Sequence, residues 1–272
     1  MQQKSKATDV PVGTFVTYYG RPVCCFKWDC TDLSGRHTLY LSISYGPESQ
    51  GIMANESEPG FYSFGNIASG ILTHVLCIVF TLFVTVLAKP GTSLFSWHPF
   101  LMTLAFSLFM TEAVLVFSPH CSPIWKLSHK TKGRVHWILQ CLCASSGTLG
   151  LVSIIYNKHV SGKPHFTSWH GQVGLGTACV VGMQCLAALP LLYHSLAKGW
   201  SLARLKRYHA VSGLVTYLLG SASLLLGMCS AWFTGTVGGQ AWYLFALCPV
   251  FSTLVVMSQV SNTYMAKKRL VS

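Results

Sequence analysis

The sequence has little charge. Only 10% of its 272 residues are charged, whereas soluble domains have about 25%. A soluble globular protein needs more charged side chains than this to cover its surface, so the composition argues against an ordinary cytosolic enzyme. Because 51% of the residues are hydrophobic, it argues more strongly against a disordered chain.

Acidic residues are especially scarce. The chain has 7 Asp+Glu against 19 Lys+Arg, and Glu112 is the only acid after residue 66. A nucleic-acid-binding protein can have the same excess of bases, but it spreads them over a folded face. Here the bases lie in short clusters between long apolar runs, which is typical of an integral membrane protein. We therefore expect membrane lipid around the chain and no nucleic-acid partner.

Several cysteine motifs are also missing. The sequence has no Cys-x-x-Cys-His, by which c-type haem is attached. No second ligand pair at zinc-like spacing follows Cys24, Cys25 and Cys30. Most of the eleven cysteines lie within apolar runs, where Cys acts as a small hydrophobic residue. The pattern favours reduced thiols and argues against a zinc-binding module or a disulfide scaffold.

Long apolar runs dominate what is present. A helix needs about 20 apolar residues to cross the hydrocarbon core of a membrane, and six stretches meet this length. The sequence thus predicts an all-α integral membrane protein with six transmembrane helices. The six expected spans are Ile67–Ala88, Leu94–Phe117, Val135–Tyr156, Trp169–Tyr193, Tyr208–Trp232 and Trp242–Tyr264.

Loop charge predicts the orientation of these spans. Three bases lie on one side, at Lys89, Lys158 and Lys163. Eleven lie on the other, at Lys126, Lys130, Lys132, Arg134, Lys198, Arg204, Lys206, Arg207, Lys267, Lys268 and Arg269. The positive-inside rule places the richer side, and with it both termini, in the cytosol.

The expected organisation is therefore a cytosolic segment over residues 1–66, a six-span domain over 67–264 and a basic cytosolic tail over 265–272. The N-terminal segment has two weakly strand-like runs, Gly13–Phe26 and His37–Tyr45. Its structure is otherwise open.

Histidines in the spans are the strongest functional signal, because an ionisable side chain within a membrane is costly. His98, His136, His170 and His209 each lie near the start of one of the spans two to five. Consecutive spans run in opposite directions. This places His98 level with His170 on the non-cytosolic side, and His136 level with His209 on the cytosolic side, inside a four-helix bundle.

Two facing imidazoles without a nearby acid or thiolate suit a haem iron held from both axial positions. Zinc would need further ligands at each level. The sequence predicts two non-covalent, b-type haems in spans two to five. Small residues follow two of the histidines on the same helix face, at Gly174 and Gly213, and would let a flat macrocycle approach the backbone. Alternatively, these glycines only pack helices and the histidines only bond between them.

Two further ionisable residues lie within the spans. His74 begins the first span at the cytosolic level, and we interpret it as a hydrogen-bonding neighbour of the cytosolic site. Glu112 lies about 21 Å along the helix from His98, on nearly the same face. It could pair with a base, handle a proton coupled to electron flow, or reach water as an interfacial carboxylate.

Iron with two histidine ligands has no open position for oxygen chemistry, so the arrangement indicates one-electron transfer. Four bases precede the cytosolic histidines, at Lys130, Arg134, Arg204 and Arg207. They could attract a small anionic reductant, or they could only set topology and contact lipid headgroups.

Two other functions remain open at this point. A proton or metal transporter would use the histidines as a path, but no span is broken by a mid-membrane proline, since Pro190 and Pro249 lie near span ends. A haem-bearing anchor for another oxidoreductase would need an obligate partner.

Several motifs resemble the cytochrome b561 family of transmembrane di-haem reductases across about residues 66–272. They are Ser-Leu-Phe-Ser-Trp-His98-Pro, Arg134-Val-His136-Trp, Trp169-His170-Gly-Gln, Leu205-Lys-Arg-Tyr-His209-Ala-Val-Ser-Gly213 and Leu218-Leu-Gly-Ser-Ala-Ser-Leu-Leu-Leu-Gly-Met-Cys229.

The resemblance implies one haem ligated by His98 and His170 and another by His136 and His209. It implies cytosolic ascorbate as the electron donor, and monodehydroascorbate radical or ferric iron as the lumenal acceptor. It suggests the endoplasmic reticulum or a vesicle membrane, and a homodimer. Lys130, Arg134, Arg204 and Arg207 become substrate-binding candidates on the cytosolic side, and His159 becomes the candidate at the acceptor side.

Overall fold

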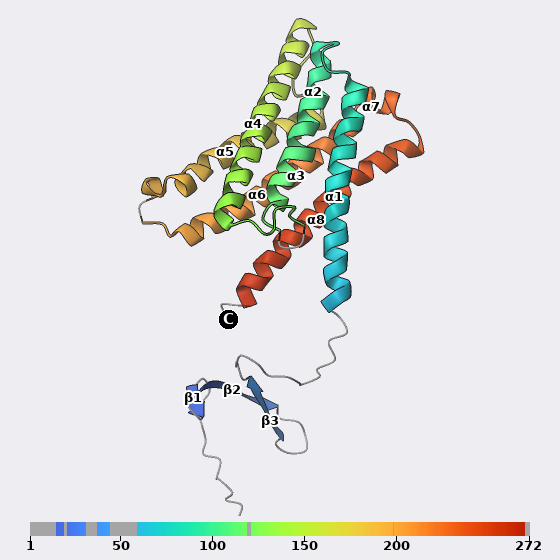
Figure 1. The fold of residues 1–272 in the computed structure, drawn as a ribbon. Helices are drawn as coiled ribbons and strands as arrows, with labels where there is room; N and C mark the ends of the chain where they lie inside the picture. Colours follow the sequence, from blue (N-terminus) through green and yellow to red (C-terminus); the bar gives the residue numbers. More distant parts are fainter. Residues whose placement is uncertain are drawn as a thin grey trace, which may run out of the picture. The chain divides into compact units, whose positions relative to one another are not determined.

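The computed structural model describes residues 15–18, 21–30, 37–43, 59–118, 121–197 and 199–269 (Figure 1). The chain divides into two compact units, Met1–Ser57 and Glu58–Ser272. The first contains an antiparallel sheet in the order β1-β2-β3, with β1 at Phe15–Tyr18, β2 at Arg21–Cys30 and β3 at His37–Ile43. The two runs predicted to be strand-like contain these strands, although β2 continues beyond the first run to Cys30.

The second unit is all-helical in its described residues. Six of its segments are long and apolar enough to cross a membrane, which confirms the predicted multi-pass protein. The spans are Phe64–Ala88, Leu94–Leu115, His129–Val160, Trp169–Leu192, Leu202–Met228 and Gln240–Asn262. They lie in α1 (Pro59–Ala88), α2 (Leu94–Thr103) with η1 (Leu104–Phe109) and α3 (Met110–Leu115), α4 (His129–Val160), α5 (Trp169–Leu192), α6 (Leu202–Met228) and α8 (Gln240–Arg269).

Two short helices lie in the connections, η2 (His194–Ala197) and α7 (Ala231–Thr236). At the starts of α2, α4, α5, α6 and α7, serine side chains accept hydrogen bonds from free backbone N–H groups. These N-cap residues are Ser93, Ser128, Ser168, Ser201 and Ser230.

The second span is not a continuous α-helix. Residues Leu104–Phe109 form a π-helical turn, in which the N–H of Met110 donates to the carbonyl of Ala105. Such turns contain one extra residue and are frequent at functional sites. This turn separates His98, in α2, from Glu112, in α3.

Spans two to five pack mainly as two helix pairs, α2 against α4 and α5 against α6. The turn η1 joins the pairs because it contacts both α4 and α6. Helices α1 and α8 pack against each other and cover this group through α2 and α6 (Figure 1). The arrangement brings the starts of α2 and α5 together, and likewise the starts of α4 and α6.

Candidate functional site

The first histidine pair, His98 and His170, joins α2 to α5. The centres of the two imidazole rings lie 5.9 Å apart, and their planes are inclined by 74°. The second pair, His136 and His209, joins α4 to α6 with a centre-to-centre distance of 6.2 Å and an inclination of 81°. These are the two pairings that the alternating directions of the spans predict.

Hydrogen bonds orient three of these four rings. The Nδ1 atoms of His98, His170 and His136 lie 3.0, 3.0 and 2.8 Å from the backbone carbonyls of Gly150, Ser223 and Ala113, respectively. A carbonyl can only accept, so each Nδ1 carries the proton and each Nε2 keeps its lone pair. Histidines that bind metals commonly have their other ring nitrogen fixed in this way.

His209 has a different environment. Its Nδ1 lies 3.1 Å from Nε2 of Gln184, and the same amide nitrogen donates to the His209 carbonyl at 2.8 Å. The Ser212 hydroxyl donates to the other end of the amide, Oε1, at 2.7 Å. One of the four rings is therefore oriented by a side chain rather than by a helix backbone.

The spacing of both pairs fits a shared metal. A bond between a first-row transition metal and imidazole is about 2 Å long, so two rings on opposite sides of one metal have centres about 6 Å apart. Among the described residues, no group of three or more His, Cys, Asp or Glu could hold a metal ion. A tetrahedral zinc site needs such a group, whereas a haem needs only the two axial histidines.

A pocket extends from the first histidine pair into the second, helical unit. Its lining combines His98 and His170 with apolar side chains such as Phe106 and Leu151, and with Lys158 and His165 near the same ends of the helices. A largely apolar pocket with a few charged groups at one end suits an amphiphilic ring with acidic substituents. The residues present therefore fit a haem.

The predicted role of the glycines is only partly supported. Gly174 lines the pocket, but a β-carbon there would lie 3.3 Å from the Ser223 hydroxyl, and one at Gly213 would lie 3.1 Å from Gln184 Nε2. Both glycines thus allow close packing of α5 and α6. Gly227 packs closely against a ligand candidate, since a β-carbon there would lie 3.1 Å from Cε1 of His170.

The four predicted cytosolic bases are all exposed and lie at the same helix ends as the second pair. Lys130 and Arg134 are in the first turns of α4, and Arg204 and Arg207 are in those of α6. Sequence reasoning did not single out Lys132, which is only 7% exposed. Its position four residues before His136 places it on the same helix face, a signal that the sequence already contained.

His159 has an exposed side chain near the end of α4. The preceding residue, Lys158, lines the pocket of the first pair, and its Nζ donates to the carbonyl of Pro164 at 3.0 Å. The acceptor-side role of His159 stays a prediction, and Lys158 and His165 are nearer candidates.

The comparisons with known proteins agree with this geometry. A family profile described as eukaryotic cytochrome b561 matches residues 97–234, which include all four histidines. The chain belongs to the cytochrome b561 family. Membership implies that it binds haem b, which agrees with the spacing of both pairs.

Individual relatives extend the similarity over most of the chain. The human transmembrane reductase CYB561D2 is 54% identical over 218 residues, which cover 80% of this chain and 98% of the relative. The mouse probable transmembrane reductase CYB561D1 is 43% identical over 80% of this chain and 95% of its own. A rice probable ascorbate-specific transmembrane electron transporter 1 is 27% identical over 59% of this chain and 67% of its own. The cytochrome b561 relatives of this chain thus support an oxidoreductase rather than a transporter of metal ions.

Proposed function

We propose that this protein transfers electrons across a membrane from cytosolic ascorbate, through two haem b groups, to monodehydroascorbate radical or ferric iron on the lumenal side. The observation that carries the proposal is the presence of two facing histidine pairs, one joining α2 to α5 and the other joining α4 to α6. When bound, each haem accepts and releases one electron. Ascorbate loses one electron on one side, and the acceptor gains one on the other.

The four histidines would hold the cofactors, and His98, His136 and His170 would do so through Nε2. Because three Nδ1–H groups donate to backbone carbonyls, these rings cannot turn without breaking a hydrogen bond. Ligation from both sides would leave no position for oxygen or another small ligand. The protein thereby favours outer-sphere transfer of single electrons over oxygen chemistry.

Basic side chains bind the anionic donor on the cytosolic side. The exposed bases Lys130, Arg134, Arg204 and Arg207 raise the local concentration of ascorbate near the second pair. The side chain of Lys132, which is only 7% exposed and shares a helix face with His136, would add a positive charge close to the second pair. On the lumenal side, Lys158, His159 and His165 hold the acceptor near the first pair.

The loop charges support an orientation with residues 1–66 and the tail 265–272 in the cytosol. We place the protein in the endoplasmic reticulum or a vesicle membrane, with a homodimer as its assembly. Labelling of cysteines engineered in the loops, in sealed microsomes, tests the orientation. Size-exclusion chromatography with light scattering tests the dimer.

The decisive experiment is a reduced-minus-oxidised absorbance spectrum of the purified protein titrated with ascorbate. We expect a b-type spectrum with two redox transitions and two haems per chain. Vesicles that contain ferric citrate and carry the protein should then form ferrous iron when ascorbate is added outside. A protein that lacks b-type absorbance, or one whose haem ascorbate cannot reduce, would refute the proposal.

A further inference from the structure

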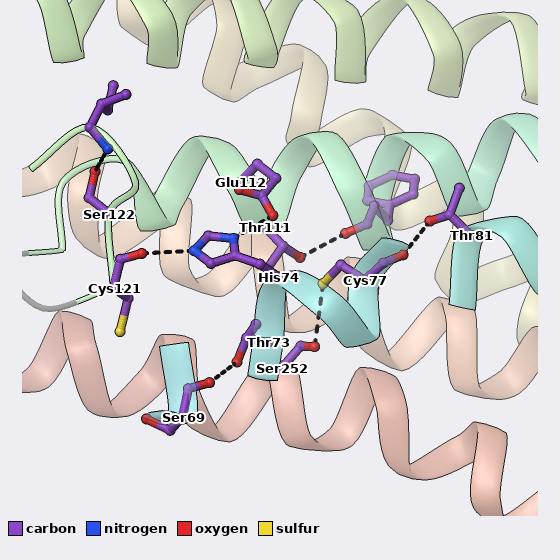
Figure 2. Close-up of polar contacts among 12 residues, drawn as sticks. Ser69, Thr73, His74, Cys77, Thr81, Thr111, Glu112, Cys121, Ser122 and Ser252 are labelled. Carbon is purple, nitrogen blue, oxygen red and sulfur yellow. Dashed lines mark hydrogen bonds and ion pairs between the residues drawn. The ribbon is translucent and has the colours of Figure 1, made fainter. Parts of the chain in front are cut away.

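The only acid after residue 66 forms an ion pair with a histidine of the first span. His74 Nδ1 lies 2.7 Å from Glu112 Oε1, and His74 Nε2 lies 2.7 Å from the backbone carbonyl of Cys121 (Figure 2). The two side chains are 19% and 22% exposed. One imidazole of α1 thus contacts both α3 and the connection that follows it.

The partners of His74 define its protonation. A carboxylate and a carbonyl both accept hydrogen bonds, so both ring nitrogens carry protons and the ring is an imidazolium. The proton between the ring and Glu112 lies on the ring because a carboxyl group is the stronger acid. His74 and Glu112 are therefore opposite charges, separated by one hydrogen bond.

The His74–Glu112 ion pair is connected to the second histidine pair through one peptide unit. Glu112 precedes Ala113, whose carbonyl accepts the Nδ1–H of His136 at 2.8 Å. The same segment contacts this ring again, since the centres of the Phe117 and His136 rings lie 5.3 Å apart. By holding Glu112 and the Cys121 carbonyl, His74 fixes both ends of the segment that orients His136.

The packing of α1 against this segment is close. A β-carbon at Gly70, one turn before His74, would overlap the side chain of Cys121. The Cys121 thiol donates to the carbonyl of Asn66 at 3.3 Å. Burial raises the pKa of this thiol, which keeps it a donor. The position of His74 is thus determined by contacts on the preceding two turns of α1.

A partly buried ion pair is weak evidence for stability, because desolvation offsets the attraction of the charges. Its effect on a nearby redox centre is more definite. A carboxylate stabilises the oxidised, more positive iron, and an imidazolium stabilises the reduced iron. Together the two charges nearly cancel, but either one alone would shift the potential of the second haem.

We propose that His74 and Glu112 are positioning residues that orient His136 and balance charge beside the second haem. This inference rests on the proposed function, since it requires a haem at the second pair. It predicts that the two residues act on one haem only, and with opposite sign.

The test is a redox titration of purified His74→Gln, Glu112→Gln and the double variant at about pH 5.5. We expect His74→Gln to lower and Glu112→Gln to raise the midpoint potential of the second haem. One uncompensated charge roughly 10 Å away changes the equilibrium about tenfold at an effective dielectric constant of about 20, which is about 59 mV for one electron.

The double variant should return towards the wild-type potential, and the first haem should stay unchanged throughout. The second haem is identified as the transition that is missing in His209→Leu. Thr81→Val is a matched control, because this α1 side chain donates only within its own helix, to the carbonyl of Cys77. If a single glutamine variant does not fold, Glu112→Asp and the double variant still test the charge, since both should keep potentials near the wild type.

Shifts of the same sign in both single variants, equal shifts of both haems, or no shift while two haems are bound would overturn the inference. Absence of haem from the wild-type protein would instead refute the proposed function, so the two failures are distinguishable.

Discussion

The first and second histidine pairs have the same two imidazoles but different surroundings. Both rings of the first pair donate to backbone carbonyls, and their pocket has Lys158 and His165 at its end. In the second pair, His209 faces the Gln184 side chain, and the His74–Glu112 ion pair lies one peptide unit from the carbonyl bound by His136. Backbone acceptors leave little room for tuning by mutation, whereas side-chain partners can change the electron affinity of a site without changing its ligands.

Removal of a ligand gives the largest effect. We expect His98→Ala or His170→Ala to lose one haem, and His136→Ala or His209→Ala to lose the other, so that the haem content of each variant falls to about half. The measurement is a pyridine haemochrome assay with a redox titration. If His98→Ala and His136→Ala removed the same redox transition, the pairing would be wrong.

The second-largest effect should come from crowding one histidine ligand, and it should affect only one of the two sites. In Gly227→Ala the new β-carbon lies 3.1 Å from Cε1 of His170, so the ring must move or its bond to Ser223 must lengthen. A disturbance of this kind typically costs about 10- to 100-fold in metal affinity. Haem retention during dialysis against apomyoglobin should fall for the first haem only. Gly235→Ala serves as the control, because a β-carbon there meets no atom within 4 Å.

The side-chain partner of His209 allows a gentler change. In Gln184→Glu, a carboxylate oxygen replaces the amide nitrogen that faces Nδ1 of His209, so that Nδ1 would donate instead of accept and the ring would become more basic. The oxidised iron is then favoured, so the midpoint potential of the second haem should fall while that of the first stays constant. A control at the first pair, Ser223→Ala, retains the backbone carbonyl that binds His170 and should leave both potentials unchanged. An equal shift in the midpoint potentials of both haems in Gln184→Glu would contradict the difference in surroundings between the two histidine pairs.

The smallest effects should come from the bases beside the second pair. Lys132→Gln removes a positive charge and should raise the KM for ascorbate at least about tenfold, since a hydrogen bond to a charged group contributes about 1.5–3 kcal/mol. The exposed Lys130→Gln should change it less than about twofold. Steady-state reduction at two salt concentrations provides the measurement. Equal effects of the two substitutions would show that burial of Lys132 has no functional meaning.

The six spans and both histidine pairs could be predicted from the sequence because their signals are local or follow from topology. Span length depends on apolar runs, and the levels of His98 and His170 follow from the alternating directions of the helices. The partnership of His74 with Glu112 could not be predicted in the same way. It depends on the rotation of α1 about its axis and on the close approach at Gly70, and the sequence suggested only that each residue lay near the cytosolic site.

The glycines and the bases show the same limit. Gly174 and Gly213 have the predicted spacing from their histidines, but the side chain opposite each one comes from the neighbouring helix, which no single-helix pattern contains. Lys132 was one of eleven bases used for orientation; its spacing from His136 could be read from the sequence, but its burial could not. Helical spacing predicts on which face of a helix a residue lies, whereas the exposure of that residue depends on what packs against the face.

The π-helical turn at Leu104–Phe109 accommodates one extra residue between the two halves of the second span, with His98 before it and Glu112 and the carbonyl of Ala113 after it. Removal of one residue from the turn should therefore leave a continuous α-helix in which Glu112 and the Ala113 carbonyl keep their partners. Removal of one residue from the α-helical part between His98 and the turn would instead rotate the two halves by about 100° relative to each other. A one-residue deletion should thus be tolerated within the turn and damaging beside it.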